Sequence, residues 1–136
     1  MRVFLDTNVL VAAFATRGLC ADVFRIVLAE HDLIMITGEV VLEELRDVLA
    51  QRLKLPPGTV ADIMALLRAQ EVVPKPANPS SLPIRDPDDR WILASAVAGG
   101  ADVLVTGDQD LLAVAAQAPL TILNPRGLWE RVRSQG

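Results

Sequence analysis

Val3-Phe4-Leu5-Asp6-Thr7-Asn8 is the stretch that decides the fold. Three apolar residues with strand propensity are followed at once by polar residues that suit the N-terminal cap of a helix. We therefore expect a buried strand that leads into a helix over residues 9–15. Residues 101–108 repeat this pattern, with a predicted strand over 101–106 around Val103-Leu104-Val105, a glycine at the turn and then Asp108.

Between and beyond these two stretches, short apolar runs alternate with segments of helical periodicity. The pattern predicts further strands over 33–36, 71–73 and 120–123, and helices over 21–30, 39–53, 59–70, 87–98, 111–117 and 127–132. Five of the nine prolines lie between Pro74 and Pro87, so this segment is predicted to be a loop. Alternating helices and short Val/Ile/Leu strands predict one α/β domain over residues 1–136 with a parallel sheet.

The composition excludes several classes of protein. Of the 136 residues, 51% are hydrophobic and 22% are charged, which is typical of a folded globular domain and excludes a disordered tail. One cysteine, Cys20, and one histidine, His31, exclude an internal disulfide framework and a zinc site built from Cys and His. Apolar runs are far shorter than the ~20 residues that span a bilayer, so we expect no membrane segment and a cytoplasmic location.

The negative charge is concentrated in one part of the chain. Residues 86–110 contain six acidic side chains and one base, Arg90, a net charge of −5, whereas the whole chain carries −4. No basic field for non-specific binding of nucleic acid is present, and aromatic residues for base stacking are few. A nucleic-acid partner would have to be held by local arginines and a metal ion; Arg85 and Arg90 flank the acidic loop and are candidates to bind a phosphate.

Two aspartates follow strands of the predicted sheet. Asp6 follows the first strand, and Asp108 follows the strand over 101–106 after one glycine. Each is a plausible helix cap when taken alone. The carboxyl ends of parallel strands meet at one edge of the sheet, where open α/β folds bind ligands, so the two carboxylates are predicted to lie together.

Two further carboxylates come from helices. Glu44 lies at the margin of the apolar stripe of the helix over 39–53, whereas Glu43 points away from that stripe. Asp89 precedes Ile92 and Leu93 by three and four residues, so it shares their inward face. Asp86 is expected to cap this helix, and Asp88 is expected to be a solvated acid in its first turn.

Four carboxylates at one crevice, without His or Cys, are typical of a site for Mg²⁺ or Mn²⁺. Such an ion generates a nucleophilic water near neutral pH and neutralises charge that develops on a phosphoryl group. Hydrolysis of a phosphodiester is the reaction that best matches Asp6, Glu44, Asp89 and Asp108.

Four motifs occur in a characteristic order along nearly the whole chain. They are Val3-Phe4-Leu5-Asp6-Thr7-Asn8-Val9-Leu10, Glu43-Glu44-Leu45, Asp86-Pro87-Asp88-Asp89 with Ile92-Leu93-Ala94-Ser95-Ala96, and Ala101-Asp102-Val103-Leu104-Val105-Thr106-Gly107-Asp108 with Leu111-Leu112. Each motif is weak alone, but the set resembles the PIN-domain ribonucleases, and among them the VapC-like toxins of bacterial toxin–antitoxin pairs.

The resemblance implies a three-layer α/β/α domain with a parallel sheet in the order 3-2-1-4-5. It also implies Mg²⁺- or Mn²⁺-dependent cleavage of single-stranded RNA, a cognate antitoxin protein and a homodimer. The catalytic and metal-binding acids of the family correspond to Asp6, Glu44, Asp89 and Asp108. Accessory roles fall to Asp86, Asp110, Thr7, Asn8 and Thr106.

One register question stays open at the glutamate helix. The small polar residue that precedes this helix in the family corresponds to Thr37 or to Gly38, and counting from Thr37 favours Glu43. Helix geometry and the pairing of glutamate with Leu45 favour Glu44, which we prefer.

Other classes of protein fit less well. A haloacid-dehalogenase-type phosphatase requires a second aspartate two residues after Asp6, where this chain has Asn8. A receiver-like Mg²⁺-binding signalling domain requires paired acids after the first strand and a lysine after the last. A PIN fold that binds RNA or protein without catalysis is the remaining alternative, and the presence of all four acids argues against it.

Overall fold

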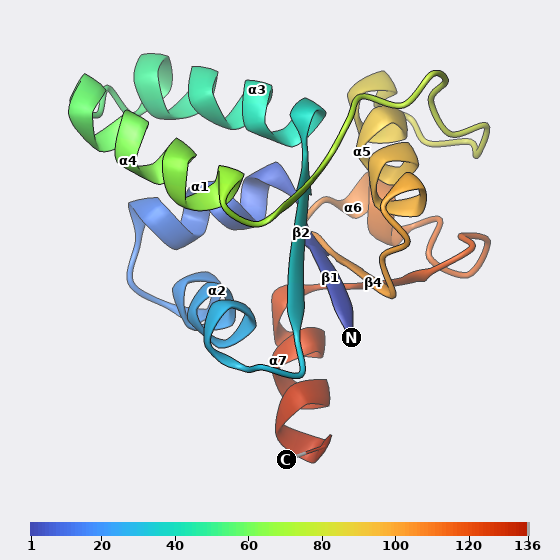
Figure 1. Ribbon diagram of the computed structural model, residues 1–136. Helices are drawn as coiled ribbons and strands as arrows, with labels where there is room; N and C mark the ends of the chain where they lie inside the picture. The colour runs from blue at the N-terminus through green and yellow to red at the C-terminus, as the bar shows by residue number, and fades with distance from the viewer. Residues whose placement is uncertain (136) are drawn as a thin grey trace.

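The computed structural model describes residues 1–135 and contains a five-stranded sheet in the order β3-β2-β1-β4-β5 (Figure 1). Every neighbouring pair of strands is parallel. The strands are β1 Arg2–Leu5, β2 Ile34–Gly38, β3 Glu71–Val73, β4 Val103–Val105 and β5 Thr121–Leu123. The predicted fold class and strand order are therefore confirmed. The order differs from the 2-1-3-4-5 arrangement of receiver domains, so the receiver-like alternative is wrong.

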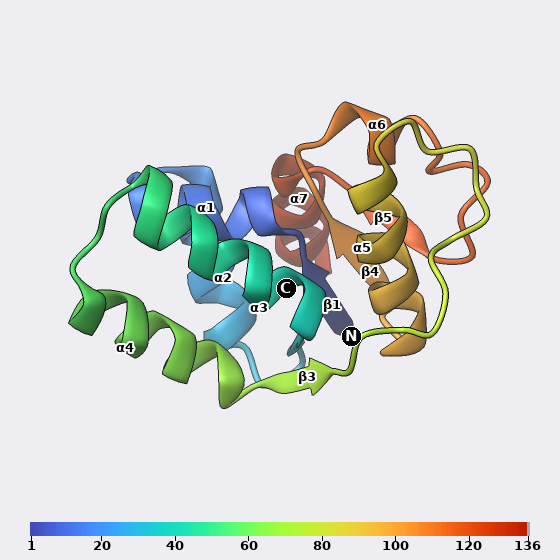
Figure 2. The same ribbon diagram turned by 90° about the horizontal axis from the view of Figure 1, so that it is seen from above.

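Helices cover both faces of the sheet and complete three layers. In Figure 2, α5 lies on one side of the sheet, and α1, α2 and α7 lie on the other. The helical elements are α1 Thr7–Ala15, α2 Leu19–Ala29, α3 Glu39–Asp47, the π turn η1 Val48–Arg52, α4 Pro57–Arg68, α5 Pro87–Ala98, α6 Gln109–Leu112 and α7 Pro125–Gln135. Within residues 1–135, none of these helices combines the length and the apolar character needed to cross a membrane.

The central strand explains why the first quoted stretch decides the fold. Val3, Phe4 and Leu5 are almost completely buried, because β1 has a strand on each edge and helices on each face. A continuous apolar run is typical of a parallel strand in this position. The register pairs Leu5 with Val105 of β4, so β1 and β4 end side by side.

All predicted helices except that over 87–98 differ at one or both ends, and three of these differences have local reasons. The helix expected over 39–53 changes to a π turn after Asp47, where Leu53 N donates to Val48 O at 3.0 Å. The helix expected over 111–117 spans only Gln109–Leu112 and is followed by turns. The last helix starts at Pro125, ahead of the expected residue 127, and the Asn124 side chain accepts a hydrogen bond from Gly127 N at 2.7 Å.

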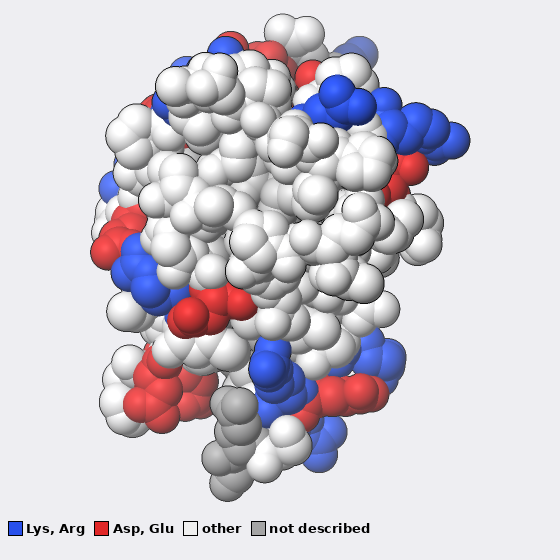
Figure 3. Space-filling model, turned by 90° about the vertical axis from the view of Figure 1, so that its right-hand side faces the viewer, with Lys and Arg blue, Asp and Glu red and all other residues white. Residues whose placement is uncertain are grey.

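Charge is unevenly distributed over the surface. The side of the molecule that lies to the right in Figure 1 is largely uncharged over its centre, with Lys, Arg, Asp and Glu side chains gathered at its edges (Figure 3). This side therefore presents little charge of its own to a polyanion. The acidic residues of interest lie instead at the carboxyl ends of β1 and β4.

Candidate metal centre

The carboxyl ends of β1 and β4 place two aspartates at one edge of the sheet. Asp6 immediately follows β1 and caps α1, and its backbone N donates to Val105 O at 2.9 Å. Asp108 follows β4 and caps α6 by accepting a hydrogen bond from Asp110 N at 2.8 Å. The structure thus brings Asp6 and Asp108 together, as the parallel arrangement of the strands predicts.

Asp6 is held in one orientation by its neighbours. Its Oδ1 accepts a hydrogen bond from Thr7 N at 2.6 Å, and its Oδ2 accepts bonds from Thr106 Oγ1 at 2.8 Å and Asn8 Nδ2 at 3.2 Å. Thr106 Oγ1 also accepts a bond from Asp108 N at 2.9 Å. A single hydroxyl therefore connects Asp6 and Asp108 and fixes their relative position. The structure places Thr7, Asn8 and Thr106 around these carboxylates.

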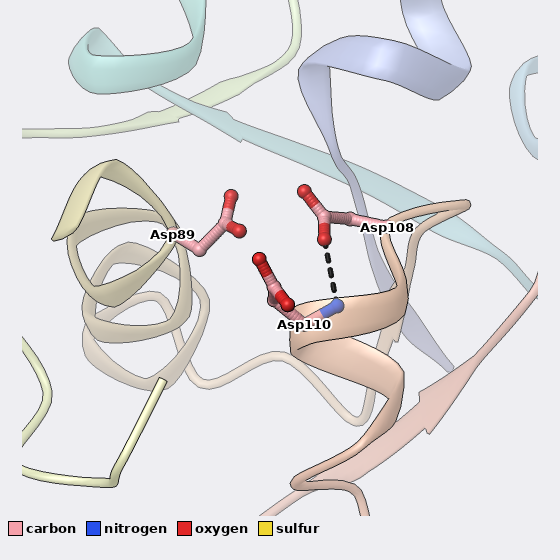
Figure 4. A group of neighbouring side chains, drawn as sticks. All are labelled: Asp89, Asp108 and Asp110. Atoms are coloured by element: carbon pink, nitrogen blue, oxygen red, sulfur yellow. Dashed lines mark hydrogen bonds between the residues drawn. The ribbon is translucent and has the colours of Figure 1, made fainter. Parts of the chain in front are cut away.

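Asp89 completes a compact group of acids with Asp108 and Asp110. One carboxylate oxygen from each lies within 4.8 Å of the others, and in Figure 4 the three side chains, from the start of α5 and the start of α6, point toward one another. Asp89 is 7% exposed, and its Oδ2 is buried without a hydrogen-bond partner. A buried carboxylate oxygen in this state is costly unless something else satisfies it.

The pKa values show the electrostatic cost of the cluster. Burial, together with the neighbouring Asp108 carboxyl, raises the pKa of Asp89 to about 8. Burial likewise raises the pKa of Asp6 to about 6, although the bonds from Thr106 and Thr7 oppose the shift. These carboxyls therefore resist ionisation in the absence of a counter-charge.

A divalent cation fits this donor set. The three clustered ligand atoms are carboxylate oxygens, which Mg²⁺ and Mn²⁺ prefer, and the unpartnered Asp89 Oδ2 is available for coordination. A cation would supply the positive charge that the buried acids lack. The residues present therefore fit a hard divalent metal.

Glu44 and Glu43 both line a cavity beside the acidic crevice, but only Glu44 also lines the crevice itself. Glu44 lines a crevice of about 460 Å³ together with Asp6, Asp89 and Asp108. Burial, and then the negative charge of Asp6, raises the pKa of the Glu44 carboxyl. Glu43 lines an adjoining cavity and is not among the residues of the crevice. The structure thus brings Glu44 to the other three acids.

Of the remaining predicted residues, Asp86 lines the crevice, whereas Arg85 and Arg90 are not among its lining residues. Asp86 caps α5, with its Oδ1 accepting a bond from Asp88 N at 2.9 Å, and both of these exposed acids line the crevice. Arg85 is 88% exposed in its side chain, and its Nε lies 3.3 Å from Asp110 Oδ1. Arg90 instead donates from Nε to Ile84 O at 2.9 Å, a contact that holds the proline-rich loop against α5.

Sequence reasoning did not group Asp110 with Asp89 and Asp108. It was expected only as an accessory acid, and the structure places one of its carboxylate oxygens within 4.8 Å of theirs. The available signal was its spacing from Asp108, because an acid two residues after a capping aspartate lies in the first turn of the helix. Arg52 also lines the crevice, and neither charge nor periodicity in the sequence distinguished it from other surface arginines.

Comparison with known proteins identifies the family. Residues 2–110 match the family described as the PIN domain, and the chain belongs to this family. A comparison with curated proteins gave no match.

Solved structures share the fold at low sequence identity. VapBC-1 from nontypeable Haemophilus influenzae matches with a TM-score of 0.64 at 18% identity, covering 93% of this chain and 99% of that chain. VapBC2 from Rickettsia felis, bound to a promoter DNA fragment, matches with a TM-score of 0.60 at 17% identity, covering 91% and 98%. The Mycobacterium tuberculosis toxin VapC20, which cleaves the sarcin-ricin loop, matches with a TM-score of 0.59 at 17% identity, covering 82% and 94%.

Proposed function

We propose that this chain is a metal-dependent endoribonuclease that hydrolyses phosphodiester bonds of single-stranded RNA, and that it is the toxin of a toxin–antitoxin pair. The observation that carries the proposal is the cluster of Asp89, Asp108 and Asp110, in which the buried Asp89 Oδ2 has no hydrogen-bond partner. Membership of the PIN family and structural likeness to VapC20, a toxin that cleaves RNA, support the reaction class.

The residues divide the chemistry between binding and orientation. Asp89, Asp108 and Asp110 would hold Mg²⁺ or Mn²⁺, with Asp6 fixed beside them by Thr106 and Thr7. A bound ion would supply Lewis-acid chemistry, namely activation of a nucleophilic water and neutralisation of charge on the phosphoryl group.

Glu44 lines the same crevice but belongs to a different helix, α3. Because its pKa is raised by burial and by Asp6, its carboxyl exchanges a proton nearer to neutral pH than an ordinary glutamate does. Glu44 is therefore suited to take a proton from the attacking water or to return one to the leaving oxygen.

The acidic crevice also bears on the protein partners of the chain. A nuclease with an open acidic crevice needs an inhibitor inside its own cell, and the VapBC structures that share this fold are complexes of toxin with antitoxin. We therefore propose a cognate antitoxin protein, and association of the chain into a homodimer in the cytoplasm.

Metal removal tests the reaction. End-labelled single-stranded RNA should be cleaved by the purified protein in Mn²⁺ or Mg²⁺, left intact in EDTA, and cleaved again when the ion is restored. Cleavage that persists in EDTA would overturn the mechanism. RNA that binds but stays intact in Mn²⁺ and Mg²⁺ would instead support the non-catalytic binding module.

A further inference from the structure

Arg52 brings a positive charge to a crevice whose other charged lining residues are all acids. It is the last residue of the π turn η1, and it lines the same cavity as Asp6, Glu44, Asp89 and Asp108. Arg85 approaches this acidic group from a different element, through its contact with Asp110. The two arginines therefore reach the site from separate parts of the chain.

The π turn accounts for the position of Arg52. An α-helix turns about 100° per residue, so Arg52, eight residues after Glu44, would lie about 80° away from it on a regular helix. The π turn uses more residues per turn, as the bond from Leu53 N to Val48 O shows, so each residue advances by a smaller angle. Arg52 consequently stays closer to the face of Glu44, and Val48 between them lines the crevice as well.

Arg52 is also free of ion pairs, unlike several other arginines. Among the side chains of residues 1–134, no carboxylate lies within salt-bridge distance of Arg52, and its guanidinium makes no hydrogen bond. Arg85 pairs with Asp110, and the Nε of Arg90 is engaged by Ile84 O. Arg52 thus keeps all five of its N–H donors for a ligand.

We propose that Arg52 binds a backbone phosphate of the RNA strand beside the metal centre. This inference rests on the proposed ribonuclease function and deepens it by naming a substrate-binding residue. The planar guanidinium matches two phosphate oxygens, and its charge offsets the repulsion between the strand and the acids Asp86 and Asp88 at the crevice mouth. The π turn is the backbone feature that directs this residue to the substrate.

The test compares Arg52→Gln with Arg46→Gln, a matched control that removes the same charge from an exposed position of α3 outside the crevice. Single-turnover cleavage of a mixed-sequence single-stranded RNA in Mn²⁺ gives the half-saturating protein concentration, measured over a range of salt. Fluorescence anisotropy of the same RNA in EDTA measures binding without cleavage. Thermal unfolding checks that each variant is folded.

For Arg52→Gln we expect an increase of about tenfold or more in half-saturating concentration, weaker anisotropy binding and a salt slope lower by about one. Arg52→Lys should recover part of the lost RNA binding, because lysine keeps the positive charge but lacks the planar guanidinium that contacts two phosphate oxygens. Arg46→Gln should behave like the wild-type protein. If Arg52→Gln and Arg46→Gln give the same values, the assignment of Arg52 is wrong while the nuclease proposal stands. If the wild-type protein neither binds nor cleaves RNA, the proposed function fails and the assignment fails with it.

Discussion

At the scale of single residues, Asp89 dominates the electrostatics of the site. Its carboxyl is buried beside Asp108, and its pKa is raised from an ordinary 3.8 to about 8. The unfolded chain releases this proton near pH 4, whereas the metal-free folded protein retains it until about pH 8. Between these values the folded state binds more protons, so its stability falls as pH rises.

The melting temperature of the metal-free protein should therefore decrease from about pH 5 to about pH 8 and level off above. Asp6, with a pKa of about 6, contributes to the lower part of this range. Asp89→Asn should flatten the curve and melt at a higher temperature near pH 8, because it removes the buried acid. Thermal scans in EDTA across this range provide the measurement, and a melting temperature that rises with pH would contradict the assignment.

The same substitution should abolish cleavage. In metal sites, loss of a hydrogen-bond partner of a ligand lowers activity by up to about 100-fold. Loss of a carboxylate ligand itself is expected to lower the activity further. Asp6→Asn and Asp108→Asn should act similarly, with the fold retained. Cleavage rates measured at saturating Mn²⁺, beside circular dichroism of each variant, distinguish a lost ligand from a lost fold. A fully active Asp89→Asn protein would remove this residue from the metal centre.

At the scale of elements, the phase of α3 decides which glutamate acts. Both glutamates line the cavity that contains Lys75 and Trp91, but only Glu44 also lines the crevice with the aspartates. Glu44→Gln should reduce the cleavage rate by about 100-fold or more, as expected for loss of an acid–base group. Glu43→Gln is the matched control with the same chemical change one residue away. Inactivity of Glu43→Gln together with activity of Glu44→Gln would show that the other register is correct.

The junction between α5 and the sheet depends on Gly99. A Cβ at this position would lie 2.6 Å from Val73 Cγ2 and 3.2 Å from Ile36 Cγ2. Gly99→Ala should lower the free energy of unfolding by about 1–3 kcal/mol, because the branched side chains of β3 and β2 must move. Gly58→Ala in α4 meets open space and should instead stabilise the protein by about 0.4–1 kcal/mol. Urea unfolding of the two variants measures both changes, and equal stabilities would contradict the packing argument.

At the scale of the whole molecule, the acidic crevice is the natural place for an inhibitor to bind. The guanidinium of an arginine from an antitoxin tail would donate hydrogen bonds to two of the carboxylates and compete with the metal. The product of the neighbouring gene, co-purified with this chain, should therefore bind more weakly at high Mg²⁺ or high salt, and more weakly to Asp89→Asn or Asp108→Asn. Affinities measured across these conditions test the idea. If no partner is found, or if the affinity of the partner does not depend on the four acids, the chain would still be a PIN-type nuclease, but the toxin proposal would fail.

The sequence by itself determined the layout of the fold and the position of two aspartates. Apolar runs followed by capping residues are local signals, and for parallel strands they also specify the edge at which the following residues meet. This is why Asp6 and Asp108 could be placed next to each other before their contacts were known. The choice of Glu44 over Glu43 also came from local geometry, the periodicity of a single helix.

Only the tertiary structure decided the finer composition of the site. The closeness of Asp110 to Asp89 depends on how α6 packs beside α5, and the pairing of Arg85 with Asp110 depends on the path of the proline-rich loop. Arg52 reaches the crevice because α3 continues into a π turn, which residue periodicity did not predict. These features come from contacts between elements distant in the sequence, or from a departure from regular helix geometry, and neither leaves a periodic pattern to read.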